Sequence, residues 1–153
     1  MSTMSRYVVA FIACYAAGFI GSLFIGPGVD LWYEQLAKPK LAPSIPVFVL
    51  IWIIMYGLMG IALGVIWSRT TLWHLWVGLF LVSLIFNASW IMFFFGFHAI
   101  LLAFIDASVL MMMLVPLFMG AWEIERRAFY LFLPYGIWMM FILYFNGTVW
   151  LNG

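Results

Sequence analysis

The chain has 153 residues, of which 69% are hydrophobic and only 7% are charged, and its formal net charge is +1. An average soluble domain is about 45–50% apolar and about 25% charged, and a fold of this size leaves too much surface in water to hide such an excess. The composition excludes a disordered chain and argues against a soluble globular enzyme, and the near-zero charge argues against nucleic acid as a partner. A single cysteine, Cys14, excludes an intrachain disulfide. Without a cysteine and histidine cluster we expect no metal and no cofactor.

Five segments are long and apolar enough to cross a bilayer, which needs about 20 residues per helix. They cover approximately residues 7–25, 45–67, 72–97, 99–122 and 128–151, and Asp106 is the only charged residue inside them. The first segment is longer than a signal-peptide core and no cleavage site stands out at its end, so we expect it to be retained. The sequence therefore predicts an all-α integral membrane protein with one domain, residues 1–153, built as a five-transmembrane-helix bundle.

The first connection, residues 26–44, is much longer than the others and holds three of the six prolines and both lysines. Loops of this length in compact proteins are usually functional or disordered. Because this one also carries Trp32, Tyr33 and Leu36, we expect an ordered cap. The remaining connections are short, so sequential helices should be antiparallel neighbours.

The basic residues divide unequally between the two ends of the predicted bundle. Cytoplasmic segments of membrane proteins carry an excess of lysine and arginine, so the end with more of them is predicted to be cytoplasmic. That end includes the N-terminus, and the absence of a cleavable signal favours a bacterial inner membrane. The two sets are Arg6, Arg69, Arg126 and Arg127 against Lys38 and Lys40.

Three polar residues inside the predicted spans need a reason, because polar groups are costly in a membrane. Asp106 is either a proton or cation site, as in a proton-coupled transporter, or a hydrogen-bonded carboxylate that ties its helix to a neighbour. Asn87 and Asn146 are open to two interpretations in the same way: an amide can bond across helices or present a donor to a ligand.

Nine tryptophans are the other anomaly of the composition. Several near the span ends are explained by the aromatic belt of the membrane interface, but Trp52, Trp90 and Trp138 lie deeper. Asn87, Trp90 and Phe94 share one helix face by their spacing. An aromatic face with an amide suits a flat apolar ligand, and ordinary helix packing is the alternative. Likewise, the spacing from Gly60 to Gly64 suits either a dimer or an internal helix contact.

The order and spacing of these motifs resemble the TspO/MBR family, which includes the tryptophan-rich sensory proteins of bacteria and the mitochondrial translocator protein. The match covers nearly the whole chain. The first loop reads WYEQLAKP over residues 32–39, followed by Pro43. The spans then contribute Trp52, Tyr56, Met59 and Gly60; Asn87, Trp90, Phe94, Phe95 and Gly96; Asp106; and Pro134, Tyr135, Trp138, Asn146 and Trp150.

The resemblance implies a five-helix bundle, usually a homodimer, with a pocket closed by the first loop. It implies porphyrins such as protoporphyrin IX as ligands, sterols such as cholesterol in some members, and benzodiazepine-type drugs. Some bacterial members promote light-dependent breakdown of protoporphyrin, and tryptophans matching Trp52 and Trp138 are linked to that activity. The expected pocket residues are Tyr33, Pro43, Trp52, Asn87, Trp90, Phe94, Trp138, Ile142 and Asn146.

The sequence departs from the family pattern at several places. Leu41 replaces a loop tryptophan, Ser83 replaces a glutamine, and the bulky Ile142 replaces a small residue, which is expected to narrow the pocket. A glycine pair associated with dimer contact is incomplete, since Val82 follows four residues after Gly78.

Three functions follow from these observations. The first is a membrane receptor that binds a porphyrin-like tetrapyrrole between the helices, with membrane lipid around it. The second is light-dependent oxidative degradation of the bound porphyrin, with Trp52 and Trp138 as catalytic residues. The third is a small proton-coupled transporter that uses Asp106.

Overall fold

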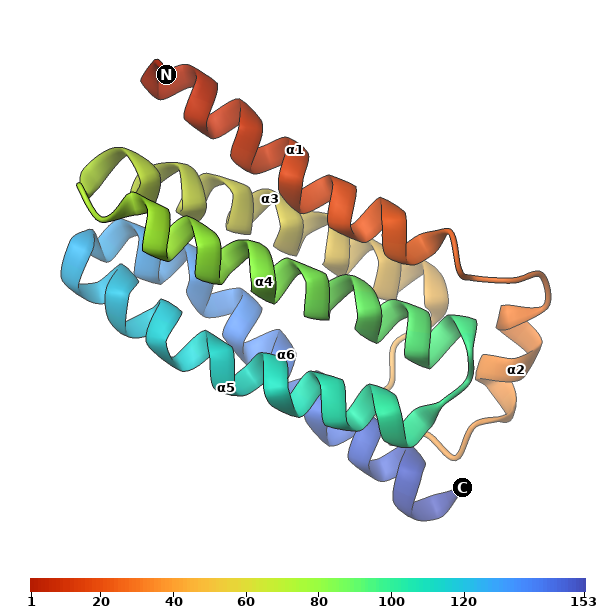
Figure 1. The fold of residues 1–153 in the computed structure, drawn as a ribbon. Coiled ribbons are helices and arrows are strands. Elements are labelled where there is room, and N and C mark those ends of the chain that lie inside the picture. Colours follow the sequence, from red (N-terminus) through yellow and green to blue (C-terminus); the bar gives the residue numbers. More distant parts are fainter.

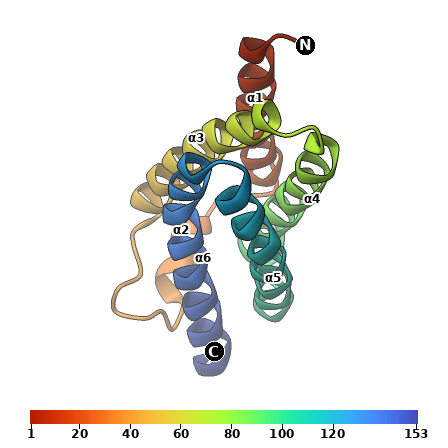
Figure 2. The same cartoon turned by 90° about the vertical axis from the view of Figure 1, so that its left-hand side faces the viewer.

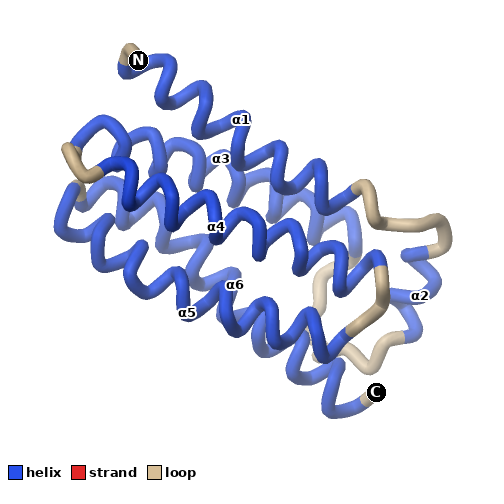
Figure 3. Tube along the Cα trace, in the orientation of Figure 1, coloured by secondary structure: helices blue, strands red, loops and turns tan.

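The structure is a computed structural model that describes residues 1–153, and it is helical with no strand (Figure 3). Five helices are long and apolar enough to cross a membrane, which confirms the predicted bundle. A short π-helix, η1, continues α4 within the same span. The elements are α1 (Thr3–Ser22), α2 (Val29–Gln35), α3 (Ile45–Arg69), α4 (Trp73–Ile91), η1 (Met92–Gly96), α5 (Ile100–Ile124) and α6 (Arg126–Asn152).

The five spanning helices form a closed ring rather than a layer. Going round it, α1 packs on α3, α3 on α6, α6 on α5, α5 on α4, and α4 back on α1. Figure 1 shows the helices from the side, and Figure 2 shows the bundle from the end that carries the N-terminus. Exposed apolar side chains cover the outer surface of the ring, as expected where lipid is the solvent.

Glycines of α3 determine how closely α1 approaches it. A Cβ atom at Gly60 would lie 3.1 Å from the Cα atom of Phe11, and one at Gly64 would meet the ring of Tyr7. Small residues at membrane helix interfaces allow this kind of close approach. The Gly60–Gly64 pair is therefore an internal contact between α1 and α3, which decides between the two interpretations that its spacing allowed.

The first loop is an ordered cap, as predicted, and it contains the short helix α2. In Figure 1, α2 lies across the end of the bundle opposite to the N-terminus. Trp32 of α2 stacks on His98, in the turn between η1 and α5, with 3.9 Å between ring centroids. Trp32 also packs edge-on against Phe94 and Phe95, so aromatic contacts hold the cap to the bundle.

The other end of the bundle carries the four arginines. Arg6 donates a hydrogen bond from its Nη1 atom to the carbonyl oxygen of Trp67, at 3.0 Å. Arg69 lies 3.8 Å from a carboxylate oxygen of Glu125, and the guanidinium of Arg126 lies over the ring of Trp122. These contacts place the N-terminus and the second and fourth connections at one end, away from the two lysines of the cap.

Candidate ligand-binding site

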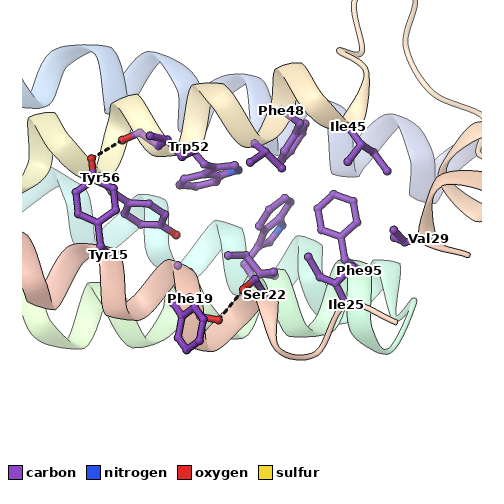
Figure 4. A pocket seen from close by; sticks show the side chains of 15 residues that line it. Tyr15, Phe19, Ser22, Ile25, Val29, Ile45, Phe48, Trp52, Tyr56 and Phe95 are labelled. Atoms are coloured by element: carbon purple, nitrogen blue, oxygen red, sulfur yellow. Dashed lines mark hydrogen bonds between the residues drawn. The ribbon is translucent and has the colours of Figure 1, made fainter. Parts of the chain in front are cut away.

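A cavity of about 470 Å³ lies between α1 and α3, beneath the cap and against the end of α4 and η1. Figure 4 shows its side chains, with those of α1 along one wall and those of α3 along the opposite wall. Thirteen of its 15 lining residues are hydrophobic. The lining residues are Tyr15, Gly18, Phe19, Ser22, Ile25, Val29, Ile45, Phe48, Val49, Trp52, Ile53, Tyr56, Trp90, Ile91 and Phe95.

The floor of the cavity is aromatic and buried, whereas its rim faces the outside of the bundle. Phe48, Trp52 and Trp90 of the floor are each less than a tenth exposed. Phe48 stacks on Trp90 with 5.9 Å between ring centroids, and Trp52 lies 5.9 Å from Trp90. Phe19 and Ile53 on the rim are 66% and 49% exposed, so the cavity opens sideways between α1 and α3.

Trp138 and Phe94 stand behind this floor and do not line the cavity. Trp138 of α6 meets Trp52 edge-on, with 6.3 Å between ring centroids. Phe94 stacks on Trp90 at 5.5 Å. The structure thus brings the three deep tryptophans together in one cluster, in which Trp52 and Trp90 face the cavity and Trp138 supports Trp52 from α6.

The indole N–H groups of these three tryptophans are buried and have no hydrogen-bond partner. A buried donor without a partner costs about 1–3 kcal/mol, and most such groups in proteins are satisfied. The donors of Trp52 and Trp90 belong to residues that line the cavity. Because the nitrogen atoms themselves are buried, the floor presents the faces of these rings to a ligand rather than their donors.

Asn87 has both ends of its amide engaged within the bundle. Tyr56 of α3 donates its hydroxyl hydrogen to Oδ1 of Asn87, and Nδ2 of Asn87 donates to the hydroxyl oxygen of Tyr135, on α6, at 2.9 Å. All three residues are buried. This arrangement ties α3, α4 and α6 together, and Asn87 does not line the cavity.

Tyr33 and Pro43 belong to the cap, where they line a separate small pocket with polar walls. Tyr33 is only 3% exposed, and its hydroxyl donates to the carbonyl oxygen of Pro43 at 2.8 Å. Lys38 donates to the carbonyl oxygen of Tyr33 and places its ammonium group 4.2 Å from the centre of that ring. Burial raises the pKa of the Tyr33 hydroxyl to about 12, so it remains a neutral donor at ordinary pH.

Three further candidate residues lie in the helix core, away from the cavity. Ile142 and Asn146 of α6 are completely buried, and Nδ2 of Asn146 donates to the carbonyl oxygen of Ile142 in the same helix. Asp106 of α5 is 6% exposed and accepts a hydrogen bond at 2.8 Å from Ser89 of α4. None of the three lines the cavity, so the bulk of Ile142 fills the core rather than narrowing this space.

Sequence reasoning missed most of the cavity walls. Phe48 precedes Trp52 by four residues, so helical spacing alone places it on the same face. Phe95 is buried next to Phe94 because η1 changes the helical register, and no sequence signal marks that change. Tyr15 and Phe19 of α1 stand among apolar residues in a helix without a distinctive motif, so nothing in the sequence singles them out.

The fold and the site together define a class of protein: a multi-pass helical membrane protein with an aromatic cavity between its helices and an ordered cap over one end. A family model described as the TspO/MBR family matches residues 10–151. The chain belongs to the TspO/MBR family.

Curated relatives agree with this assignment along most of their length. The tryptophan-rich protein TspO of Chlorobaculum tepidum is 31% identical over 140 residues, which cover 89% of this chain and 88% of the relative. The tryptophan-rich protein TspO of Bacillus cereus is 25% identical, covering 94% of each chain. The protein CrtK of Rhodobacter capsulatus is 27% identical, covering 97% of this chain and 92% of the relative.

Proposed function

We propose that the protein is a membrane receptor for a porphyrin-like tetrapyrrole such as protoporphyrin IX, which it binds in the cavity between α1 and α3. The observation that carries the proposal is an aromatic floor, formed by Phe48, Trp52 and Trp90, in a cavity whose walls are almost entirely apolar. Stacking on these rings accounts for the preference for a flat apolar molecule.

The size of the cavity supports the same ligand class. Small-molecule sites usually measure about 300–1,000 Å³ and have mostly apolar walls with a few polar groups, and this cavity, of about 470 Å³, has that character. A sterol or a benzodiazepine-type drug is also apolar and of suitable size. However, a sterol lacks the flat aromatic surface that the rings of Trp52 and Trp90 would stack on.

Titration of protoporphyrin IX against tryptophan fluorescence in the dark tests the proposal. Saturable quenching is expected in the wild type, and Trp52→Phe should weaken binding by roughly threefold to tenfold, because it replaces the indole by a smaller ring and loses about 1 kcal/mol of stacking. Trp122→Phe is the matched control, since Trp122 lies at the opposite end of the bundle. Absence of saturable quenching, or equal weakening in both variants, would refute the proposal. A sterol and a benzodiazepine-type drug, added as competitors, identify which ligand classes share the site.

A second candidate function is light-dependent oxidative degradation of the bound porphyrin. The specific observation in its favour is the contact of Trp52 with both Trp90 and Trp138, which forms a chain of oxidisable indoles beside the ligand. Illumination of the complex in air should bleach the porphyrin absorbance faster than in empty micelles, and Trp138→Phe should slow this loss more than it weakens binding. Equal loss of absorbance in protein and in empty micelles would refute degradation, and binding would remain as the proposed function. No observation favours proton-coupled transport, because Asp106 does not line the cavity.

The arginine-rich end gives the orientation that we propose. Four arginines cluster with the N-terminus, whereas the two lysines lie in the cap at the other end. By the excess of basic residues on the cytoplasmic side, the N-terminus is cytoplasmic and the cap faces the opposite side of a bacterial inner membrane. Labelling of single cysteines by an impermeant reagent at Ser2 and at Lys40 tests this orientation: in intact cells the label should reach position 40 and not position 2.

A further inference from the structure

A ligand could reach the cavity from the capped end of the bundle or from the side, between α1 and α3, and the contacts across these two routes differ. At the capped end, α2 seals the bundle with the stack of Trp32 on His98 and the burial of Tyr33 between Phe95 and Phe145. Lys38 adds a hydrogen bond to the same segment. Because of these contacts, a ligand that entered through the cap would have to break several aromatic contacts and a hydrogen bond.

Fewer contacts close the side of the cavity between α1 and α3. Towards the N-terminal end, the two helices are in close contact, with Phe11 and Tyr7 packed on the glycines of α3. Beyond Tyr15, the two helices keep one close contact, between Gly18 and the ring of Tyr56. The rest of this stretch is the cavity, whose rim residues Phe19 and Ile53 are exposed on the outer, lipid-facing surface.

A single side-chain hydrogen bond crosses this opening. The hydroxyl of Tyr15 on α1 donates to the carbonyl oxygen of Ile53 on α3 at 3.0 Å (Figure 4). Gly57 makes this reach feasible, since a Cβ atom there would lie 3.1 Å from the tyrosine oxygen. Tyr15 is 40% exposed, so its ring can swing outward without leaving a cavity in the core.

We propose that the cavity is loaded from the hydrocarbon phase of the bilayer through the opening between α1 and α3, and that Tyr15 gates this route. This inference rests on the proposed function, and it adds the path of the ligand and the residue that controls it. The apolar macrocycle of a ligand held in the bilayer then reaches the aromatic floor without crossing the polar surface of the cap.

Two matched variants distinguish the lateral route from a route through the cap. Tyr15→Phe and Tyr33→Phe each remove one hydroxyl that donates to a backbone carbonyl, across the opening in the first case and within the cap in the second. Both retain the ring. The measurement is stopped-flow quenching of tryptophan fluorescence by protoporphyrin IX, with the protein in phosphatidylcholine nanodiscs, to obtain the association and dissociation rates.

A gate changes both rates together and leaves the equilibrium affinity alone. Tyr15→Phe should raise both rates about threefold to tenfold, as expected from the loss of one hydrogen bond, so that the dissociation constant changes less than either rate. Ile53→Trp should narrow the opening and slow both rates. Tyr33→Phe should leave the rates unchanged.

Faster rates in Tyr33→Phe with unchanged rates in Tyr15→Phe would overturn the inference and place the route through the cap. Unchanged rates in both variants, or equal acceleration in both, would also overturn it. Each of these results leaves the proposed binding function intact. A wild type with no saturable binding would overturn the proposed function and the gate together, so the two failures are distinguishable.

Discussion

The hydrogen-bonded group of Tyr56, Asn87 and Tyr135 makes a sharp prediction about stability. Each residue comes from a different helix, and all three are buried. Asn87→Leu keeps the volume of the side chain but removes an acceptor from Tyr56 and a donor from Tyr135. Two tyrosine hydroxyls then remain in the apolar core without their partner.

The expected cost follows from the number of bonds lost and the groups left behind. Hydrogen bonds between membrane helices average about 0.6 kcal/mol with a maximum of about 1.7, and a buried polar group without a partner costs about 1–3 kcal/mol. We therefore expect Asn87→Leu to lower the free energy of unfolding by about 2–4 kcal/mol. Replacing all partners by apolar groups of the same shape can be nearly neutral, so adding Tyr56→Phe and Tyr135→Phe should restore at least about 1 kcal/mol.

Equilibrium unfolding in mixed detergent micelles, without ligand, measures both values. Ser83→Ala is the control, because Ser83 is buried in the same helix but donates only to the carbonyl of Phe80 one turn away. Its effect should stay below about 1 kcal/mol, because it removes one hydrogen bond and leaves no buried donor unpaired. The triple variant combines Asn87→Leu with Tyr56→Phe and Tyr135→Phe. If it is less stable than Asn87→Leu alone, the argument from unpaired hydroxyls is refuted, and these three side chains stabilise the fold mainly by packing.

Three further predictions concern the α1–α3 contact, the buried carboxylate and the cap. Gly60→Leu should lower the free energy of unfolding by about 1–3 kcal/mol, because the backbone of α1 leaves no room for the new side chain. Gly78→Leu is the control and should have little effect, since the space around Gly78 is open. Equal thermal unfolding temperatures of the two variants would contradict this prediction. Ser89→Ala should cost about 1–3 kcal/mol by leaving a carboxylate oxygen of Asp106 without its donor, and adding Asp106→Leu should recover part of that loss in the same unfolding assay. Burial raises the pKa of Tyr33 to about 12, above the value near 10 of an unfolded tyrosine. Its neutral hydroxyl thus stabilises the fold below about pH 10, and this contribution falls as the pH rises towards 12. The stability difference between wild type and Tyr33→Phe should be constant from about pH 6 to about pH 9 and shrink above about pH 10, and a difference that shrinks already at pH 8 would contradict the assigned burial.

The spans were predictable because the signal for a membrane helix is local. A run of about 20 apolar residues is sufficient evidence of a spanning helix. What the sequence did not predict are two short elements: the helix α2 in the first loop and the π-helix η1 at the end of α4. The seven residues of α2 are too few to stand out in a loop. The π-helix η1 depends on a change of hydrogen bonding from four to five residues, as in the bond from Phe97 to the carbonyl of Met92, which no residue type in the segment demands.

The cavity was less predictable because it depends on which helices are neighbours. Spacing shows that Trp52 and Phe48 share one face of α3, but it does not show that this face looks towards α1. The sequence directed attention to α6, where Trp138, Ile142 and Asn146 carry the family pattern. The structure instead places α1, with no motif of its own, along the open wall.

Hydrogen bonding separates the polar residues that hold the bundle together from those that are free to meet a ligand. From the sequence, Asn87 could either bond across helices or present a donor to a ligand. The structure gives each end of its amide a partner on another helix. Asp106 and Asn146 each keep one unpaired oxygen, but neither residue lines the cavity. Trp52 and Trp90 alone combine an unpaired polar atom with a place on the cavity wall. Both nitrogen atoms are buried, so a ligand in the cavity meets the faces of these rings first. This is why the indole rings, rather than the amide or the carboxylate, should decide what the cavity binds.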